Sequence, residues 1–179
     1  MTDTATASRP QAAAQGSGAA LQLYYDDVTI GDELAQVVKG PMTGSHIMLW
    51  SAAIENWHRV HYDLPFAKEH DKLPGLLVNG SWKQHVLAQL LKDWAGRGGW
   101  PWKINFEYRG MDIAGDTITA WGRITGKEER DGLGIVTLEI GLRNSRDVDS
   151  TSGDAVVVLP LRGGRAVPYP FVAPAARGA

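Results

Sequence analysis

One long amphipathic segment, SWKQHVLAQLLKDWA at residues 81–95, limits the folds open to this chain more than any other feature. Its large apolar residues recur at the spacing of one helix face, which predicts a helix. The predicted apolar face comprises Trp82, Val86, Leu90, Leu91 and Trp94, while Lys83, Gln84, Lys92 and Asp93 are expected to point away from it. Asn79 or Ser81 can cap the start of this helix, and Gly96 is placed to end it.

The residues after this segment are predicted to form β-strands. In KINFEYR, Ile104, Phe106 and Tyr108 alternate with polar residues, which is the period-two pattern of a half-buried strand. Further strands are predicted at 116–129, 134–143 and 154–162, with a turn at Asp131-Gly132, a loop over 144–153 and an earlier strand near 34–39. Pro160 lacks a backbone donor, so it is expected at a sheet edge or a strand end. One long helix with an antiparallel meander predicts an α+β fold, with the sheet wrapped around the helix.

The length and composition are those of an ordinary globular chain. With 179 residues, 44% hydrophobic and 21% charged, the sequence predicts one domain. We expect a disordered tail at 1–20, which lacks large apolar side chains, a domain at 21–165 and an extended tail at 166–179. The net charge of −2 and the lack of a long apolar run predict neither a nucleic-acid nor a membrane partner, and a cytoplasmic location is expected. Because the chain has no cysteine, disulfides, zinc–thiolate sites and cysteine nucleophiles are excluded.

A shorter helix is predicted upstream of the long one. Its apolar stripe recurs at helical spacing and comprises Ile47, Trp50, Ile54 and Trp57. Thr43 or Ser45 can cap its start, and the stripe predicts an end close to Trp57. The polar residues of NWHRVHYDLPFAKEH, at 56–70, are therefore expected at the exit of this helix.

Three interpretations of this polar cluster are open. His58, His61 and Asp63 could bind zinc or iron, although no second cluster supplies a further ligand. They could equally be solvated residues at the end of a helix. The third interpretation is an acid/base site, because histidine titrates near neutral pH.

A glycine-bearing loop, LPGLLVNGS at 73–81, leads from this cluster into the long helix. The first backbone N–H groups of a helix lack partners within the helix and carry a partial positive charge. They can stabilise an oxygen that gains negative charge during a reaction. A histidine near them would make an acid/base site suited to thioester or carbonyl chemistry.

The run NWHRVHYDLPFA, followed by LPGLLVNG and an amphipathic helix, resembles the MaoC-like dehydratases of the hot-dog fold. This family includes (R)-specific enoyl-CoA hydratases and 3-hydroxyacyl-thioester dehydratases. His61 takes the place of the family histidine and Asp63 that of the later aspartate, over a resemblance that spans roughly residues 22–163. Asn56 stands where an aspartate is usual, and Asn79-Gly80 where His-Gly is usual. The asparagine version resembles the branch of type 2 hydroxyacyl-thioester dehydratases and mesaconyl-CoA hydratases.

The resemblance implies a single hot-dog domain and a hydro-lyase of fatty acid metabolism. It would hydrate a 2-enoyl thioester reversibly, or dehydrate a 3-hydroxyacyl thioester, on CoA or acyl-carrier protein, without a metal or redox cofactor. His61 would be the general base and acid, with Asn56 fixing the water or the imidazole by a hydrogen bond. The backbone N–H of Gly80, flanked by Asn79 and Ser81, would bind the thioester oxygen. Asp63 and His58 would support the site.

The same resemblance leaves the assembly and the activity open. It implies a homodimer, or a heterodimer with a related hot-dog subunit, with the acyl chain in a tunnel between helix and sheet. Since an amide cannot accept a proton at neutral pH, Asn56 weakens any mechanism that needs a carboxylate base. Glu55 and Asp63 are the alternative carboxylates for that part. The alternatives to a dehydratase are a non-catalytic subunit that pairs with an active paralogue, and a hot-dog thioesterase.

Overall fold

A five-stranded antiparallel sheet carries most of the core in the computed structural model, which describes residues 22–175. The strands are β1 (Val37–Lys39), β2 (Trp100–Tyr108), β3 (Ile118–Arg130), β4 (Leu133–Asn144) and β5 (Asp149–Pro160). Their order in the sheet is β1-β3-β4-β5-β2, and each neighbouring pair is antiparallel. The predicted turn at Asp131-Gly132 is confirmed, with φ angles of 53° and 67°.

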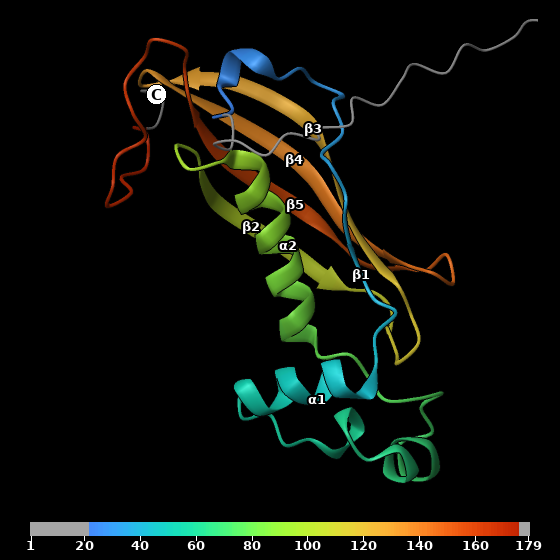
Figure 1. The fold of residues 1–179 in the computed structure, drawn as a ribbon. Coiled ribbons are helices and arrows are strands. Elements are labelled where there is room, and N and C mark those ends of the chain that lie inside the picture. The colour runs from blue at the N-terminus through green and yellow to red at the C-terminus, as the bar shows by residue number, and fades with distance from the viewer. Residues whose placement is uncertain (1–21, 176–179) are drawn as a thin grey trace, which may run out of the picture.

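The long helix α2 (Gly80–Ala95) lies across one face of the curved sheet, as Figure 1 shows. The prediction placed its start one residue later. It ends as predicted at Gly96, whose φ of 68° lies in the left-handed region that favours glycine. The helix and the sheet share a core of aliphatic side chains that includes Val86, Leu87, Leu90, Leu91, Ile118, Ala120, Leu138, Ile140, Ala155 and Val157. This arrangement confirms the predicted α+β fold.

The strands differ from the prediction in two places. β5 begins at Asp149, inside the predicted loop 144–153, because Thr151 pairs with Leu142 of β4 and with Tyr108 of β2. Ser150 and Thr151 are both fully buried. β2 does not follow the meander, since it pairs with β5, with Trp100 opposite Val158 and Tyr108 opposite Thr151. Only β3, β4 and β5 form a meander, and β2 becomes one edge of the sheet. Pro160 lies at the end of its strand, as expected.

The short helix α1 (Gly44–Ala53) begins at a threonine cap, as predicted. The Thr43 hydroxyl accepts the backbone N–H of His46 at 3.2 Å. The prediction that this helix continues to Trp57 is wrong, because it ends at Ala53 and Glu55 has a left-handed φ of 54°. Ile54 and Trp57 are 41% and 58% exposed, so they do not extend the buried stripe.

Beyond α1 the chain forms two short helical turns, the 3₁₀ turn η2 (Arg59–His61) and the π turn η3 (Phe66–His70). Figure 1 shows α1 and these turns gathered past the N-terminal end of α2, outside the sheet. A 3₁₀ turn, η1 (Tyr25–Asp27), precedes β1. The segment that positions the predicted site residues is thus a separate layer under the start of the long helix.

The structure describes only part of the predicted tails. Residues 161–175 contain no helix or strand, and the Phe171 ring stacks on Trp100 with 5.4 Å between ring centroids. The predicted tail at 1–20 lies outside the described residues, and the predicted boundaries at 21 and 165 stay predictions. No helix within residues 22–175 has the length and apolar character needed to cross a membrane.

Candidate active site

His61, the last residue of η2, is 7% exposed and is held by the loop that leads into α2. Its Nδ1 lies 2.8 Å from the carbonyl oxygen of Leu77. Because a carbonyl oxygen only accepts hydrogen bonds, Nδ1 must carry the proton of the neutral ring. Nε2 is then an acceptor with a free electron pair. The same loop is fixed to η2 by the Leu77 N–H, which donates to the Val60 carbonyl at 3.0 Å.

Asn56 contacts this acceptor directly. Its Nδ2 lies 3.3 Å from Nε2 of His61 and donates to Oδ1 of Asn79 at 2.8 Å. Its Oδ1 accepts the backbone N–H of His58 at 3.2 Å. A backbone N–H can only donate, so this contact fixes which end of the amide is oxygen. The amide of Asn56 therefore presents N–H groups to His61 and Asn79.

Asn79 occupies the N-cap position of α2, as predicted, but its side chain does not cap the helix. Its Nδ2 instead donates to Oγ of Ser51 at 2.9 Å, and the Ser51 hydroxyl donates to the Ile47 carbonyl at 3.0 Å. Ser51 is fully buried in α1 and was not among the predicted site residues. The only sequence signal for it is a hydroxyl four residues after Ile47, on the face of the predicted helix that becomes buried.

The first backbone donors of α2 lack partners in the described residues. Within the described part of the chain, the backbone N–H groups of Gly80 and Ser81 donate to no partner. The side chain of Tyr108, at the end of β2, lies so close to Gly80 that a Cβ there would be 2.9 Å from the ring. The Ser81 hydroxyl accepts the indole N–H of Trp50 at 3.0 Å, which ties α2 to α1.

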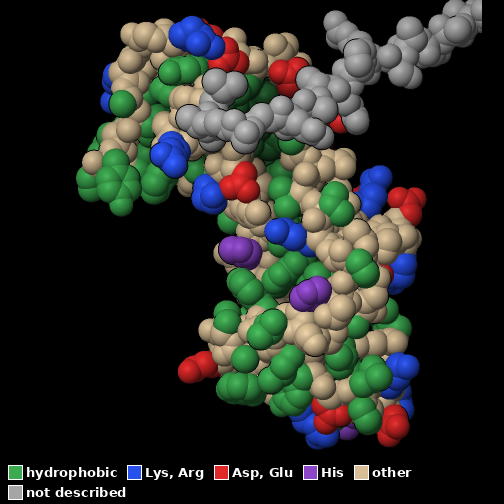
Figure 2. Space-filling view, viewed as in Figure 1, with side chains coloured by type: hydrophobic (Ala, Val, Ile, Leu, Met, Phe, Trp, Pro, Cys, Tyr) green, Lys and Arg blue, Asp and Glu red, His purple; other side chains and the backbone are tan. Residues whose placement is uncertain are grey.

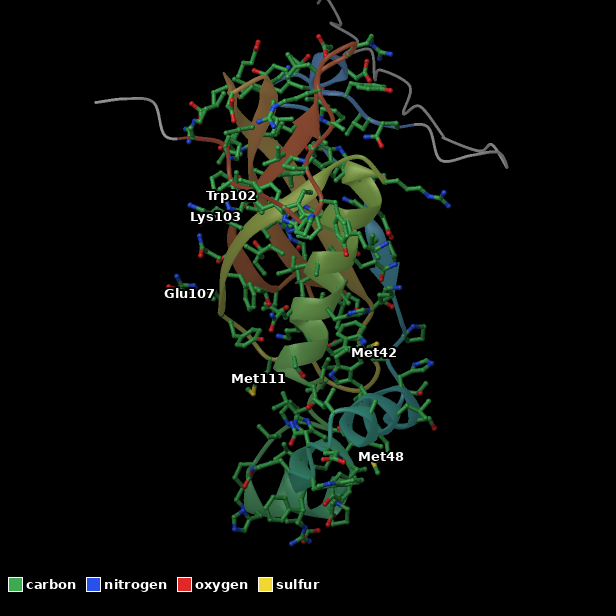
Figure 3. The ribbon with its side chains drawn as sticks, turned by 90° about the vertical axis from the view of Figure 1, so that its left-hand side faces the viewer. Met42, Met48, Trp102, Lys103, Glu107 and Met111 are labelled. Carbon is green, nitrogen blue, oxygen red and sulfur yellow. The ribbon has the colours of Figure 1, made fainter. Side chains whose placement is uncertain are left out.

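A buried ion pair lies under the first turn of α2. Lys83, predicted to point into solvent, is only 3% exposed, and its Nζ lies 2.7 Å from Oδ2 of the fully buried Asp112. Nζ also donates to the Gly110 carbonyl at 2.8 Å, and Asn144 donates to Oδ1 of Asp112 at 2.8 Å. Figure 3 shows Met111, in this loop after β2, on the opposite side of the α2 start from Met42. The loop thus anchors the start of the helix from the side of β2.

Comparison with known proteins shows what this chain is similar to. Residues 32–116, just under half of the chain, match the family model described as hydroxyacyl-thioester dehydratase type 2. This stretch is therefore similar to the type 2 hydroxyacyl-thioester dehydratases. No curated protein sequence matches the chain.

Several solved structures share the fold of this chain. An (R)-hydratase from A. caviae involved in PHA biosynthesis is 22% identical, with a TM-score of 0.66 over 74% of this chain and 98% of that one. A MaoC-like dehydratase from Rhodospirillum rubrum is 18% identical, with a TM-score of 0.68 over 78% and 98%. The ChsH1-ChsH2 complex from Mycobacterium tuberculosis is 21% identical, with a TM-score of 0.63 over 73% of this chain and 98% of that one. At these identities the likeness shows the α+β hot-dog fold.

The side chains of the remaining predicted residues lie around the His61 network without joining it. His58 is exposed, with its ring centroid 6.1 Å from that of His61. The Asp63 carboxylate pairs with Arg59 at 2.7 Å and accepts the Phe66 N–H at 3.1 Å, and these two contacts hold its pKa below the ordinary value. Glu55 is exposed. Within residues 22–175, no three potential metal ligands gather as the metal interpretation would require.

The environment of His61 favours its neutral form. Burial is the main cause that lowers the pKa of His61 below its ordinary value. The hydrogen bond to Leu77 partly opposes this effect, and the nearby His58 adds to it. A neutral imidazole with Nδ1 protonated leaves Nε2 able to accept a proton, which is the requirement for a general base.

A large cavity lies away from the His61 network. It has a volume of about 980 Å³ at the C-terminal end of α2, where Trp100 and Tyr169 are among its lining residues. None of the residues of the His61 network lines it. The candidate site is therefore defined by its hydrogen bonds and by the open start of α2.

Proposed function

We propose that this chain adds water reversibly to a 2-enoyl thioester, giving a 3-hydroxyacyl thioester, with His61 as general base and acid. The observation that carries the proposal is the hydrogen-bonded connection from His61 through Asn56 to Asn79, at the open start of α2. It brings a neutral imidazole to the helix end whose first N–H groups are free. The match of residues 32–116 to the hydroxyacyl-thioester dehydratases of type 2 supports this reaction class.

In the hydration direction, Nε2 of His61 takes a proton from water while the water oxygen bonds to C3. The electrons of the C2–C3 double bond move toward the carbonyl, so the thioester oxygen gains negative charge. The Gly80 N–H and the positive end of α2 stabilise that charge. The imidazolium then gives its proton to C2, which returns His61 to its starting form.

Asn56 has a role that an ionised aspartate could not fill, because it donates a hydrogen bond to His61. Its N–H donates to Nε2 of neutral His61, and the same N–H would face the new Nε2 proton of the imidazolium. This opposition makes the imidazolium a stronger acid, which favours return of the proton to C2. The proposed cycle therefore needs no carboxylate beside His61, and it uses neither a metal nor a redox cofactor.

The test uses a panel of trans-2-enoyl-CoA substrates of different chain length and branching, followed by loss of the enoyl absorbance. His61→Ala should lower kcat about 100-fold or more, because general acid–base catalysis contributes that much. His70→Ala is the matched control, since the His70 side chain is 71% exposed and pairs with Asp71 outside the site. Full activity of His61→Ala would refute the proposal.

Two other outcomes would indicate a different function for the chain. Release of free thiol from acyl-CoA, without a change at the enoyl bond, would indicate a thioesterase. Hydration that appears only after a related hot-dog subunit is added would indicate an accessory subunit, and one structural relative is titled as the two-component complex ChsH1-ChsH2. We propose an assembly of two hot-dog subunits, and CoA and acyl-carrier protein both stay open as the thioester carrier.

A further inference from the structure

We infer that Ser51 is a positioning residue for the proposed reaction: through Asn79 it fixes the amide of Asn56 as a hydrogen-bond donor to Nε2 of His61. The inference rests on the proposed function for its meaning in catalysis. Its physical content, the direction of a hydrogen-bond chain, can be measured independently of activity.

The chain of hydrogen bonds is continuous, and its Ser51–Asn79 end is buried. It runs from the Ile47 carbonyl through the Ser51 hydroxyl, the Asn79 amide and the Asn56 amide to the His61 ring, with spacings of 3.0, 2.9, 2.8 and 3.3 Å. Ser51 is 0% exposed and Asn79 is 2% exposed. Water therefore has little access to replace a lost partner at this end of the chain.

Fixed groups at the two ends set the direction. The Ile47 carbonyl only accepts, so Ser51 gives its hydrogen to Ile47 and offers its electron pair to Nδ2 of Asn79. The His58 backbone N–H only donates, so Oδ1 of Asn56 must face it. Both constraints lead to the same contact in the middle, where Asn56 donates to Oδ1 of Asn79.

Without the Ser51 hydroxyl a second arrangement becomes available. The buried Nδ2 of Asn79 would lose its acceptor, and leaving a buried donor unpaired is unfavourable. Rotation of the Asn79 amide would turn its N–H groups toward Asn56 and leave its oxygen, instead of a donor, without a partner. The Asn56 amide would rotate in response and give up the His58 N–H, a contact at the exposed end of the chain of hydrogen bonds. Oδ1 of Asn56 would then face Nε2 of His61 and favour a proton there. Ser51 and the His58 N–H thus act together to select the arrangement in which His61 is a base.

Other charges near His61 stay constant in this comparison. The facing groups are His58 and the Arg59–Asp63 pair on the same turn, and the first turn of α2 adds the buried Lys83–Asp112 pair. A substitution at Ser51 leaves all of them unchanged. A shift of the His61 pKa in such a variant therefore reports on the direction of the hydrogen-bond chain.

The experiment compares the full-length wild type with Ser51→Ala and Ser51→Thr. NMR of the ring nitrogens, assigned with His61→Ala, gives the tautomer and pKa of His61, and kcat/KM is measured against pH. In Ser51→Ala we expect the pKa to rise by roughly half a unit to one unit, with a parallel shift of the acidic limb of kcat/KM. At neutral pH kcat/KM should fall about tenfold, mainly through kcat. Ser51→Thr, which keeps the hydroxyl, should restore the wild-type pKa.

The outcome separates this inference from the proposed function. An unchanged His61 pKa and pH profile in Ser51→Ala would overturn the inference, even if His61→Ala is inactive. A wild-type ring with its proton on Nε2 would overturn it without any variant, including the case in which Ser51→Ala fails to fold. Full activity of His61→Ala would instead overturn the proposed function, while the NMR result would still decide the direction of the hydrogen-bond chain.

Discussion

At the scale of single residues, Gly80 shows how a missing side chain serves the site. A Cβ there would lie 2.9 Å from Cζ and 3.0 Å from the hydroxyl of Tyr108, closer than such atoms approach. Gly80→Ala must therefore displace the Tyr108 ring or the start of α2. We expect a loss of about 1–3 kcal/mol in the free energy of unfolding, as for other overpacked sites. We also expect kcat/KM to fall at least about tenfold, because the backbone donor moves.

Urea denaturation and enoyl-CoA kinetics measure the two effects. Tyr108→Ala is the companion variant, since it removes the ring that the new methyl group would meet. Adding it to Gly80→Ala should recover stability relative to the sum of the two single changes. If Gly80→Ala matches the wild type in both stability and kcat/KM, the close approach to Tyr108 has no bearing on the site.

Individual residues also show what the sequence could and could not predict. The gathering of His61, Asn56 and Asn79 was predicted because two short runs with distinctive polar residues resemble one family. Ser51 was missed because its role depends on complete burial, which a serine in a helix does not reveal. Lys83 was predicted to be solvated because helical spacing assigns a long polar side chain to the outer face. Its partner, Asp112, lies in a loop after a later strand, and spacing along one helix cannot show such a contact.

At the scale of secondary-structure elements, the start of α2 depends on the Lys83–Asp112 pair. Lys83→Met would leave the carboxylate of Asp112 buried without its cation, which should cost about 3–5 kcal/mol in the free energy of unfolding. Adding Asp112→Asn removes the charge and keeps an oxygen for Asn144, so the double variant should recover much of that loss. Urea denaturation of the two single variants and the double variant measures the coupling.

An exposed ion pair provides the control for this cycle. Arg123 and Glu139 pair at 3.3 Å with side chains 55% and 49% exposed, so Arg123→Met should change stability by less than about 1 kcal/mol. A loss for Lys83→Met no larger than that of Arg123→Met would contradict a structural role for the buried pair.

Element boundaries were the least predictable part of the fold. The strongly periodic segments correctly predicted α2 and the central strands. The end of α1 was missed because Ile54 and Trp57 continue the apolar spacing, although the backbone turns left-handed at Glu55 between them. The start of β5 was missed because DSTSG has the composition of a loop, and only pairing on both sides makes it a strand. The error at β5 comes from tertiary pairing that overrides the local pattern.

At the scale of the whole molecule, apolar surface lies on the layer formed by α1 and the turns after it. Figure 2 shows hydrophobic side chains gathered over this part of the molecule. Leu49, Trp57 and Leu64 are 70%, 58% and 43% exposed. Such a surface is typical of an interface. Charged residues of β2, Lys103 and Glu107, project from the outer edge of the sheet in Figure 3.

We predict that the chain assembles with a second hot-dog subunit through the apolar layer around Trp57. Light scattering after size-exclusion chromatography should give a mass near twice the 19.4 kDa of one chain, or a complex with a related subunit. Trp57→Glu should shift the protein toward the mass of one chain, because it places a charge in the apolar surface. His70→Ala, outside that surface, should leave the mass unchanged. A wild-type chain that stays at 19.4 kDa at high concentration, with or without a related subunit, would refute the prediction.

The uncapped start of α2 has one more consequence. Because the Asn79 side chain is engaged by Asn56 and Ser51, residues 22–175 supply no substitute acceptor for the first amides of the helix. Solvent must hydrate those amides in the free protein, and an arriving carbonyl displaces solvent without breaking any internal contact. The cost of leaving these amides without a protein acceptor is thus part of the free energy of folding. It does not recur each time a ligand binds.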